Sequence, residues 1–232
     1  MEMKKWGIGL LAAAVLFAAA PQYPAQAAAI QVPESVFHWV QSTSRQNYYF
    51  NKEQMCYGVD VSGNIDLNTL IVPTLRTYDD VQKQDVVDKR RWKMMATDGY
   101  DNLVGCAEYL SFNLTDKTVT VTQHDDLDNT WTALSSTHDG TPMKVCGRSD
   151  KDVDAKFYRA ILLYAQEHQD ELIARTKGNL SKADQKMLKN GTDPLDLLIK
   201  QGTSASSTPS VQKKAGARQT AGRTGAQNGR SK

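Results

Sequence analysis

The order of strand-like and helix-like segments is the strongest constraint on the fold of this chain. Within residues 30–202, patterns typical of strands dominate the first half, and patterns typical of helices dominate the end. Strands followed by helices, without regular alternation, indicate an α+β fold. We therefore expect a mainly antiparallel β-sheet packed against one long C-terminal helix, which short helices follow.

The clearest strand signal is a hairpin near the middle of the chain. Over residues 118–122, Val119 and Val121 alternate with threonines, which is the period-two pattern of a half-buried strand. The preceding segment 109–114 is rich in strand-forming residues, and residues 115–117 make a short connection between the two. Further strands are expected over residues 36–42, 47–50, 59–75 and 129–134.

Two segments of the first half carry mixed signals. Gly63 lies in a turn-forming triplet, and Pro73 predicts an edge strand or a strand end because it cannot donate a ladder hydrogen bond. Residues 79–91 lack an apolar helical stripe, although Val86 and Val87 can anchor one turn. This segment is expected to be either a short helix or a long irregular connection.

A long amphipathic helix is expected over residues 150–176. Ser149 is placed to cap its first turn, with Asp152 three residues later. The apolar stripe that should lie on the sheet consists of Val153, Phe157, Ile161, Tyr164, His168 and Leu172. The position of His168 on this stripe favours a half-buried core histidine over a ligand.

Two shorter helices are expected after the long one. Ser181 and Asp193 are placed to cap them, and Gly202 is placed to end the second. Together they would form a short helical extension, residues 179–202, to an α+β domain that spans residues 30–178.

Residues 1–29 have the pattern of a secretory signal peptide. Two lysines precede an apolar run over residues 6–20, and an Ala-x-Ala site predicts cleavage after Ala27 or Ala29. A spanning helix needs about 20 apolar residues, so the end of the run at Pro21 favours cleavage over an anchor. No second long apolar stretch follows, so we expect no transmembrane segment in the mature chain. The short signal led by lysines is typical of bacteria and predicts export to the periplasm or the cell surface.

Residues 203–232 predict a disordered basic tail. The segment contains no Asp or Glu and too few apolar residues to offset the entropy of ordering. Its cations are Lys213, Lys214, Arg218, Arg223, Arg230 and Lys232. The tail is expected either to contact an anionic envelope surface or to act only as a solubilising segment. Export makes nucleic acid a less available partner, and none is expected.

The formal net charge of +2 for the 232 residues hides these unlike segments. The signal contributes +1, residues 30–202 contribute −5 and the tail contributes +6. The mature protein is therefore expected to be an acidic domain with a basic tail.

The three cysteines, Cys56, Cys106 and Cys146, leave the disulfide state open. An oxidising compartment favours pairing, but an odd number cannot pair completely within one chain. Their spacing lacks the close pairs of zinc sites, so no zinc site formed by these cysteines is expected. Cys106 lies in an apolar run, which favours a buried thiol.

Two acidic segments are candidate calcium sites. Residues 124–128 offer His124 and three aspartates just after a predicted strand, and a solvated acidic turn is favoured there over a Ca²⁺ site. Residues 60–71 begin like an EF-hand loop, but Ile65 and Ile71 occupy positions that the motif cannot accept. We therefore predict no metal ion and no cofactor.

One cationic run inside the acidic domain is a candidate binding site. It consists of Lys89, Arg90, Arg91, Trp92 and Lys93. Arginine and tryptophan are over-represented at binding hot spots, so the run is a candidate for contact with an anionic glycan or an acidic protein surface. The alternative, which the usual behaviour of charge runs favours, is a solvated face with Trp92 in the core. The other aromatic residues Trp39, Tyr48, Tyr49 and Trp131 are also interpreted first as core residues.

The order of these elements resembles the surface-adhesin protein E family of bacterial exported proteins. The resemblance rests on a strand containing Trp39, an aromatic strand over residues 48–51, a later Trp131 and a C-terminal helix that Ser149 opens and that carries Phe157. It spans about residues 35–175, and its motifs are short. It implies a small antiparallel sheet packed by a helix and a non-enzymatic binding role.

The function predicted from these features is binding at the periplasm or cell surface, with an unknown protein or an envelope polymer as the partner. The alternative is a periplasmic hydrolase that uses a Cys–His or His–Asp site, although the chain contains no G-x-S-x-G, H-E-x-x-H or S-x-x-K motif. We therefore predict no catalytic residues.

Overall fold

The structure, a computed structural model, describes residues 31–138, 140–145, 149 and 151–204, and it has the predicted α+β class. Eight strands form one antiparallel sheet in the order β1-β2-β4-β5-β6-β7, with β3 also paired to β4 and β8 also paired to β6. The strands are β1 (Phe37–Ser42), β2 (Gln46–Asn51), β3 (Cys56–Val59), β4 (Ile65–Tyr78), β5 (Leu103–Asn113), β6 (Thr118–Asp128), β7 (Ala133–Thr137) and β8 (Met143–Lys144). The α-helices are α1 (Asp80–Trp92), α2 (Val153–Glu167), α3 (Gln169–Arg175), α4 (Lys182–Asn190) and α5 (Pro194–Ser204).

The predicted central hairpin is confirmed, and β5 and β6 form the most extensive pairing of the sheet. The turn at Gly63 between β3 and β4 is also confirmed, with a left-handed backbone that suits glycine (φ 78°). The prediction for Pro73 is wrong, because it lies inside β4 and not at an edge or end. Along one side of β4, residues 74–78 pair with β2 and residues 65–71 pair with β3. Pro73 lies at this change of partner, where a ladder donor is not needed.

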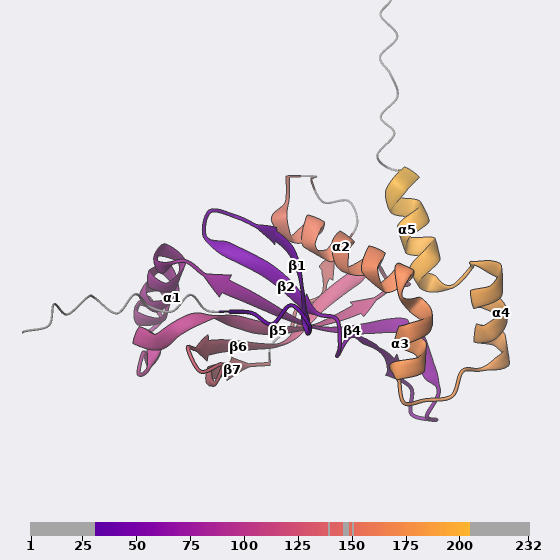
Figure 1. Ribbon diagram of the computed structural model, residues 1–232, viewed down its shortest axis with the longest axis horizontal. Helices are drawn as coiled ribbons and strands as arrows, with labels where there is room; N and C mark the ends of the chain where they lie inside the picture. Colours follow the sequence, from indigo (N-terminus) through magenta and orange to yellow (C-terminus); the bar gives the residue numbers. More distant parts are fainter. Residues whose placement is uncertain (1–30, 139, 146–148, 150, 205–232) are drawn as a thin grey trace, which may run out of the picture.

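The main hydrophobic core lies between the sheet and α2, which crosses one face of it (Figure 1). Phe157, Ile161 and Ala165 of α2 are fully buried, so the predicted apolar stripe does face the sheet. Phe112 of β5 meets Tyr158 edge to face at 5.8 Å between ring centroids. Burying a side chain of this size is worth about 1.5–3 kcal/mol, and the core contains many such residues.

The expectation of one long C-terminal helix is wrong. The helix is broken at His168, and its two parts are α2 and α3. The end of α3 is held by tertiary hydrogen bonds. Arg175 donates to the backbone oxygens of Lys52 and Met55, and the hydroxyl of Thr176 accepts a hydrogen bond from the backbone N–H of Tyr57. These bonds satisfy backbone groups near β3, and a straight continuation of α2 would not place the same residues there.

The cap of α2 also differs from the prediction. Asp152, and not Ser149, is the N-cap, and its side chain accepts hydrogen bonds from the backbone N–H groups of Asp154 and Ala155. Aspartate suits this position as well as serine does. The helix therefore begins at Val153, three residues later than expected.

The two short C-terminal helices are confirmed with one correction. Ser181 caps α4, and Asp193 accepts hydrogen bonds from the first backbone N–H groups of α5. Gly202 does not end α5, which continues to Ser204. Leu195 of α5 is completely buried within the main core, so this helix packs on the domain.

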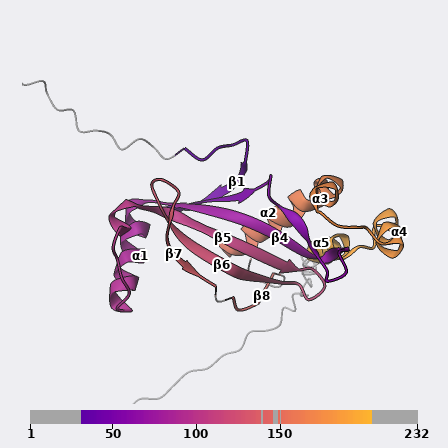
Figure 2. The ribbon, with the colours of Figure 1, turned by 90° about the horizontal axis from the view of Figure 1, so that it is seen from below.

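Residues 79–91 form a helix and not an irregular connection. Asp79 caps α1 by accepting the backbone N–H of Gln82. None of the residues of α1 is buried. The helix stands at the end of the sheet opposite α4 and α5, as Figures 1 and 2 show.

The strand expected around Trp131 begins later than predicted. Trp131 lies in the turn before β7, with a left-handed backbone (φ 64°), and β7 starts at Ala133. Among the residues that the structure describes, none of the helices has the length and apolar character needed to cross a membrane.

Candidate functional site

Polar residues cross the helix-facing side of the sheet beside the first turns of α2, where Arg76 pairs with Asp154 and Tyr48 packs on Phe157. Directly opposed residues form a row across five strands, and the row consists of Tyr48, Arg76, Cys106, Asp126 and Ser135. The next row contains Glu108 and its neighbour on β6, His124. Directly opposed residues in a sheet have Cβ atoms about 4.5–5.5 Å apart, so the two rows bring these side chains together. We call Arg76, Cys106, Glu108, His124 and Asp126 the charged cluster.

His124 lies at the centre of the charged cluster, between two carboxylates. Its Nδ1 is 3.2 Å from Glu108 Oε1, and its Nε2 is 3.3 Å from Asp126 Oδ1. The two carboxylate side chains are only 11% and 8% exposed, whereas His124 is 33% exposed. Contact with both carboxylates raises the pKa of His124 to about 9, so the ring is cationic at neutral pH.

Each carboxylate uses its second oxygen for an arginine. Glu108 Oε2 is 2.9 Å from Arg76 Nη2, and Asp126 Oδ2 is 3.5 Å from Arg90 Nη1. Burial alone would raise the pKa of both carboxyl groups, but His124 and the hydrogen-bond partners around it outweigh burial, and both pKa values are lowered. The carboxylates are therefore charged at neutral pH and balance the surrounding cations.

Asp126 is held by neutral donors as well. The hydroxyl of Tyr100 donates to Asp126 Oδ2 at 2.7 Å, and the hydroxyl of Ser135 donates to the same oxygen at 3.1 Å. Arg90 also lies over the ring of Tyr100, 4.3 Å from its centroid. These partners fix the orientation of the Asp126 carboxylate without using the oxygen that faces His124.

The environment of Cys106 makes it a poor nucleophile. The thiol is buried, and burial together with the nearby Glu108 carboxylate raises its pKa far above the usual value. A nucleophilic cysteine needs a thiolate and a neutral base in reach, but His124 is cationic and both of its nitrogens are occupied. The structure thus brings together a Cys–His pair and a His–Asp pair, in a geometry that argues against the hydrolase alternative at this cluster.

The prediction that residues 124–128 form a solvated acidic turn is wrong. They are the end of β6, and Asp125, Asp126 and Leu127 are buried. The charged cluster was missed because the register shifts between Tyr109 and Leu110: Val121 opposes Leu110, and His124 opposes Glu108. This bulge puts Val121 and His124 on the same face, whereas strict alternation places them on opposite faces.

The cationic run of residues 89–93 is divided by the structure. Arg90 is drawn into the charged cluster, and its side chain is only 13% exposed. Trp92 is 84% exposed, so the alternative with Trp92 in the core is wrong. The other members point to solvent at the end of α1, where Met94 and Met95 follow them. We call Lys89, Arg91, Trp92, Lys93, Met94 and Met95 the basic tip.

Trp39 and Trp131, also expected in the core, are 53% and 38% exposed. Tyr48 is buried as predicted, and Tyr49 is only partly buried. Trp131 lies in the turn before β7, and Trp39 lies on β1, of which no residue is buried.

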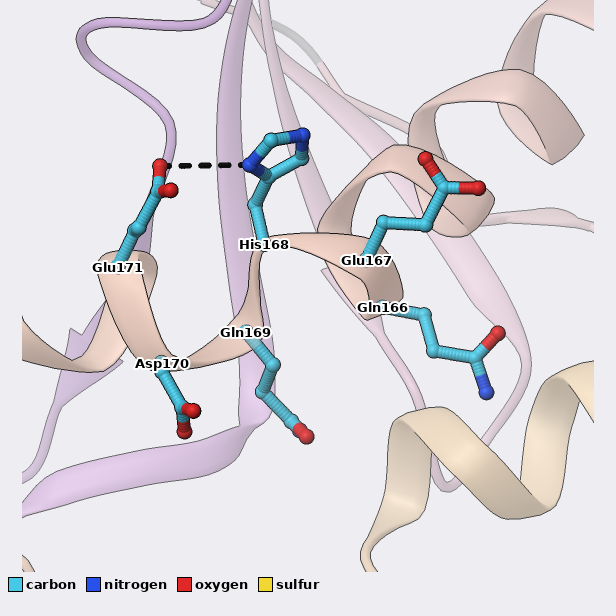
Figure 3. A pocket seen from close by; sticks show the side chains of 6 residues that line it. All are labelled: Gln166, Glu167, His168, Gln169, Asp170 and Glu171. Carbon is cyan, nitrogen blue, oxygen red and sulfur yellow. Dashed lines mark ion pairs between the residues drawn. The ribbon is translucent and has the colours of Figure 1, made fainter.

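A polar depression lies where α2 gives way to α3. Figure 3 shows that its lining residues, 166–171, point to different sides of the chain and do not converge. His168 is 3.3 Å from Glu171 and stacks on Tyr164, as the half-buried prediction required. Gln169 donates to the hydroxyl of Tyr57 and to Asp193. These contacts hold helices together and leave few groups free for a ligand.

Other predictions fall partly or wholly outside the described residues. The signal segment, the basic tail with its six cations, and Cys146 are not described by the structure. Cys56 and Cys106 are both free thiols.

Comparison with protein-family models, with curated proteins and with solved structures finds no match for this chain. The resemblance to the surface-adhesin protein E family stays a prediction.

Proposed function

We propose that this protein is an exported binding domain that attaches to an anionic lipid surface of the bacterial envelope through its basic tip. The observation that carries this proposal is the exposure of Trp92 (84%) and Met94 (95%) among lysines and arginine at the end of α1. Large apolar side chains this exposed, grouped together, mark interaction sites on soluble domains.

The chemistry of the basic tip fits a lipid surface with anionic head groups. Tryptophan favours the membrane–water interface, where its ring is partly buried and its N–H stays hydrated. Each lysine or arginine near an anionic surface adds about 1 kcal/mol. Arg91 is paired with Asp88 at 3.4 Å, so Lys89 and Lys93 supply the uncompensated charge. An acidic protein would attract the same cations but would not by itself explain two exposed side chains that favour hydrocarbon.

The end of α1 holds Met94 outward at a cost in stability. The backbone N–H groups of Met94 and Met95 bond back to Arg91 and Arg90, which is the pattern of a helix ending with a left-handed residue. Met94 takes this conformation (φ 56°), where glycine is the usual residue. The conformation costs a non-glycine residue about 1–2 kcal/mol. A methionine that is unfavourable for folding and almost fully exposed is consistent with a role in binding.

The sequence supports the same location. The predicted signal peptide would export the domain, and the predicted tail carries six further cations for an anionic surface. Neither segment contributes a residue to the basic tip, so the contributions of the tip and the tail can be measured separately.

The test is co-sedimentation of the protein with vesicles of phosphatidylcholine, with or without phosphatidylglycerol. We expect binding that requires phosphatidylglycerol and weakens with salt. Trp92→Ala should weaken binding about tenfold or more, because inserting a large side chain is worth about 1.5–3 kcal/mol. Trp39→Ala is the matched control, since Trp39 is also exposed but lies on β1, and it should bind like the unaltered protein.

Met94→Gly separates binding from folding. Glycine relieves the left-handed backbone, so this variant should be as stable as the unaltered protein or more stable, by about 1 kcal/mol. It should nevertheless bind the anionic vesicles more weakly. A general loss of structure would change both quantities in the same direction.

Three results would contradict the proposal. Equal binding to both kinds of vesicle would exclude recognition of anionic lipid. Binding that is lost on removal of residues 203–232 but unaffected by Trp92→Ala would assign the contact to the tail alone. Retention of an acidic protein in place of vesicles would point to a protein partner.

A further inference from the structure

We infer that Cys106, Glu108 and His124 of the charged cluster form a binding site for one divalent transition-metal ion, with Zn²⁺ as the best fit. Their ligand atoms, Cys106 Sγ, a Glu108 carboxylate oxygen and a His124 ring nitrogen, all lie within 4.8 Å of one another. This inference is independent of the basic tip, because none of the three residues belongs to it.

The donor set selects the class of metal. Thiolate, imidazole and carboxylate together are typical of Zn²⁺, whereas Ca²⁺ and Mg²⁺ take oxygen ligands only. With bonds of about 2.0–2.3 Å, tetrahedral ligand atoms lie roughly 3.3–3.8 Å apart. Glu108 Oε1 and His124 Nδ1 are already 3.2 Å apart. A shift of about 1 Å by the Cys106 thiol would complete a three-ligand site with an open fourth position.

The surroundings of His124 have the arrangement that orients metal-binding histidines. If Nδ1 binds the ion, Nε2–H donates to Asp126 Oδ1, from which it lies 3.3 Å. Histidine ligands commonly donate their second N–H to a carboxylate in this way. Asp126 is itself fixed by Tyr100, Ser135 and Arg90 through its other oxygen. The second sphere is thus in place on β6, β7, α1 and the short 3-10 helix Tyr100–Asn102 before β5.

The two nearby arginines approach the carboxylate oxygens that do not face His124. Arg76 approaches Glu108 Oε2, and Oε1 faces His124. Arg90 approaches Asp126 Oδ2, and Oδ1 faces His124. Each arginine therefore approaches the carboxylate oxygen other than the one that faces His124.

The charge of the cluster balances when the ion binds. Metal ligands must be deprotonated, so Cys106 Sγ loses its thiol proton and His124 loses the proton that now joins it to Glu108. Two protons leave and one Zn²⁺ enters, which keeps the net charge of this buried region unchanged. His124, a third exposed, gives the ion a route from solvent to the buried thiol.

The experiment titrates the protein with Zn²⁺ by calorimetry and with Co²⁺ by absorption, under a reductant that contains no thiol. We expect one ion per chain and a thiolate-to-cobalt charge-transfer band. Cys106→Ser should abolish the band and weaken Zn²⁺ binding at least a hundredfold, and His124→Gln should weaken it similarly. Cys56→Ser is the matched control for a free thiol elsewhere, and it should keep both the band and the affinity.

Asp126→Asn tests the second sphere. This variant should retain the cobalt band, because Cys106 is unchanged, and should bind Zn²⁺ about 10–100-fold more weakly. The inference is overturned if the unaltered protein shows no thiolate-to-cobalt band. It is also overturned if Cys106→Ser, shown by circular dichroism to be folded, keeps the band or the Zn²⁺ affinity. An Asp126→Asn variant with unaltered affinity would overturn the assignment of Nδ1 as the ligand atom.

Discussion

Replacing Arg76 by methionine removes the cation that faces Glu108 and tests whether the charged cluster acts as a coupled unit. The Arg76 and Glu108 side chains are 15% and 11% exposed, and their charged atoms are 2.9 Å apart. Removing one partner of a buried ion pair costs about 3–5 kcal/mol, because the other charge is left in a medium of low dielectric constant. Arg76 also lies 4.8 Å above the ring of Tyr48, a contact worth about 1 kcal/mol. Its second carboxylate partner, Asp154, is 35% exposed and adds little.

We therefore expect Arg76→Met and Glu108→Leu each to lower the free energy of unfolding by about 3–5 kcal/mol. The double variant replaces both charges by apolar side chains of similar size, and it should be no less stable than either single variant. The coupling energy of the cycle should then be about 3 kcal/mol or more. Arg45 and Asp85 form the control pair, because both are more than 40% exposed. The same cycle on this surface pair should yield less than about 1 kcal/mol.

The assay is urea unfolding followed by tryptophan fluorescence, with a chelator present so that no bound metal contributes. A domain of this size has a stability of about 5–15 kcal/mol, so the single variants should still fold. If the Arg76 and Glu108 substitutions are additive within about 0.5 kcal/mol, or cost no more than the control pair, the cluster is not a coupled buried network.

Three further predictions concern a helix cap, a close contact between two strands and a buried tyrosine, each of which affects the stability of the fold. Asp193→Ala removes the cap of α5 and the acceptor for Gln169, so it should lower the free energy of unfolding, measured by urea unfolding, by about 2–3 kcal/mol. Asp193→Asn keeps an acceptor oxygen and should cost less than half as much. Gly105→Ala should prevent folding or lower the melting temperature severely, because the new Cβ would lie 2.0 Å from the backbone oxygen of Arg76. Gly63→Ala is the control: no atom lies within 4 Å of its Cβ, so it should lower the free energy of unfolding by only about 1 kcal/mol. A similar loss of stability in both variants would refute the predicted clash at Gly105. Burial raises the pKa of Tyr57 to about 12, so the neutral phenol stabilises the fold fully below pH 10 and this stability is lost as pH rises toward 12. Tyr57→Phe should cost about 1 kcal/mol at pH 7 through the bond to Gln169, and the difference should vanish or reverse by pH 12 in stability measured against pH.

The local patterns in the sequence predicted the elements that depend on local physics. The hairpin of β5 and β6 follows from the alternation of Val119 and Val121, and the start of α4 follows from Ser181, because capping and alternation involve only neighbouring residues. The α+β class follows from the order of such elements along the chain.

The break between α2 and α3 is set by contacts that no local pattern contains. The apolar stripe continues through His168 to Leu172, and both ends of the stripe are packed as expected. What redirects the chain is a set of bonds from Arg175 and Thr176 to residues 52–57, in and just before β3, more than 100 residues away in the sequence. Tertiary hydrogen bonds here override a helical periodicity.

The charged cluster was invisible to sequence reasoning for a related reason. Its members come from β4, β5 and β6, and only the sheet register places Arg76 beside Cys106 and Cys106 beside Asp126. The bulge in β6 then reverses the expected face of His124. The available signal was the pair of strongly polar residues Glu108 and His124 within segments that were otherwise strand-like, a pattern that marks a buried polar site once the register is known.

The cost of this cluster is itself an argument about function. Apolar residues of similar volume would stabilise the face of the sheet at least as well as a buried ion network does, and the adjacent part of the same face, under α2, is built in that apolar way. The Arg76–Glu108 cycle measures this directly: a double variant as stable as the single ones, or more stable, shows that folding does not require the charges. If that variant also binds Zn²⁺ more weakly, as expected when the ligand Glu108 is lost, the two results together explain the cluster as a metal site that lowers the stability of the fold. If instead it is much less stable than both single variants, the network is structural, and the inferred metal site must then rest on the cobalt spectrum alone.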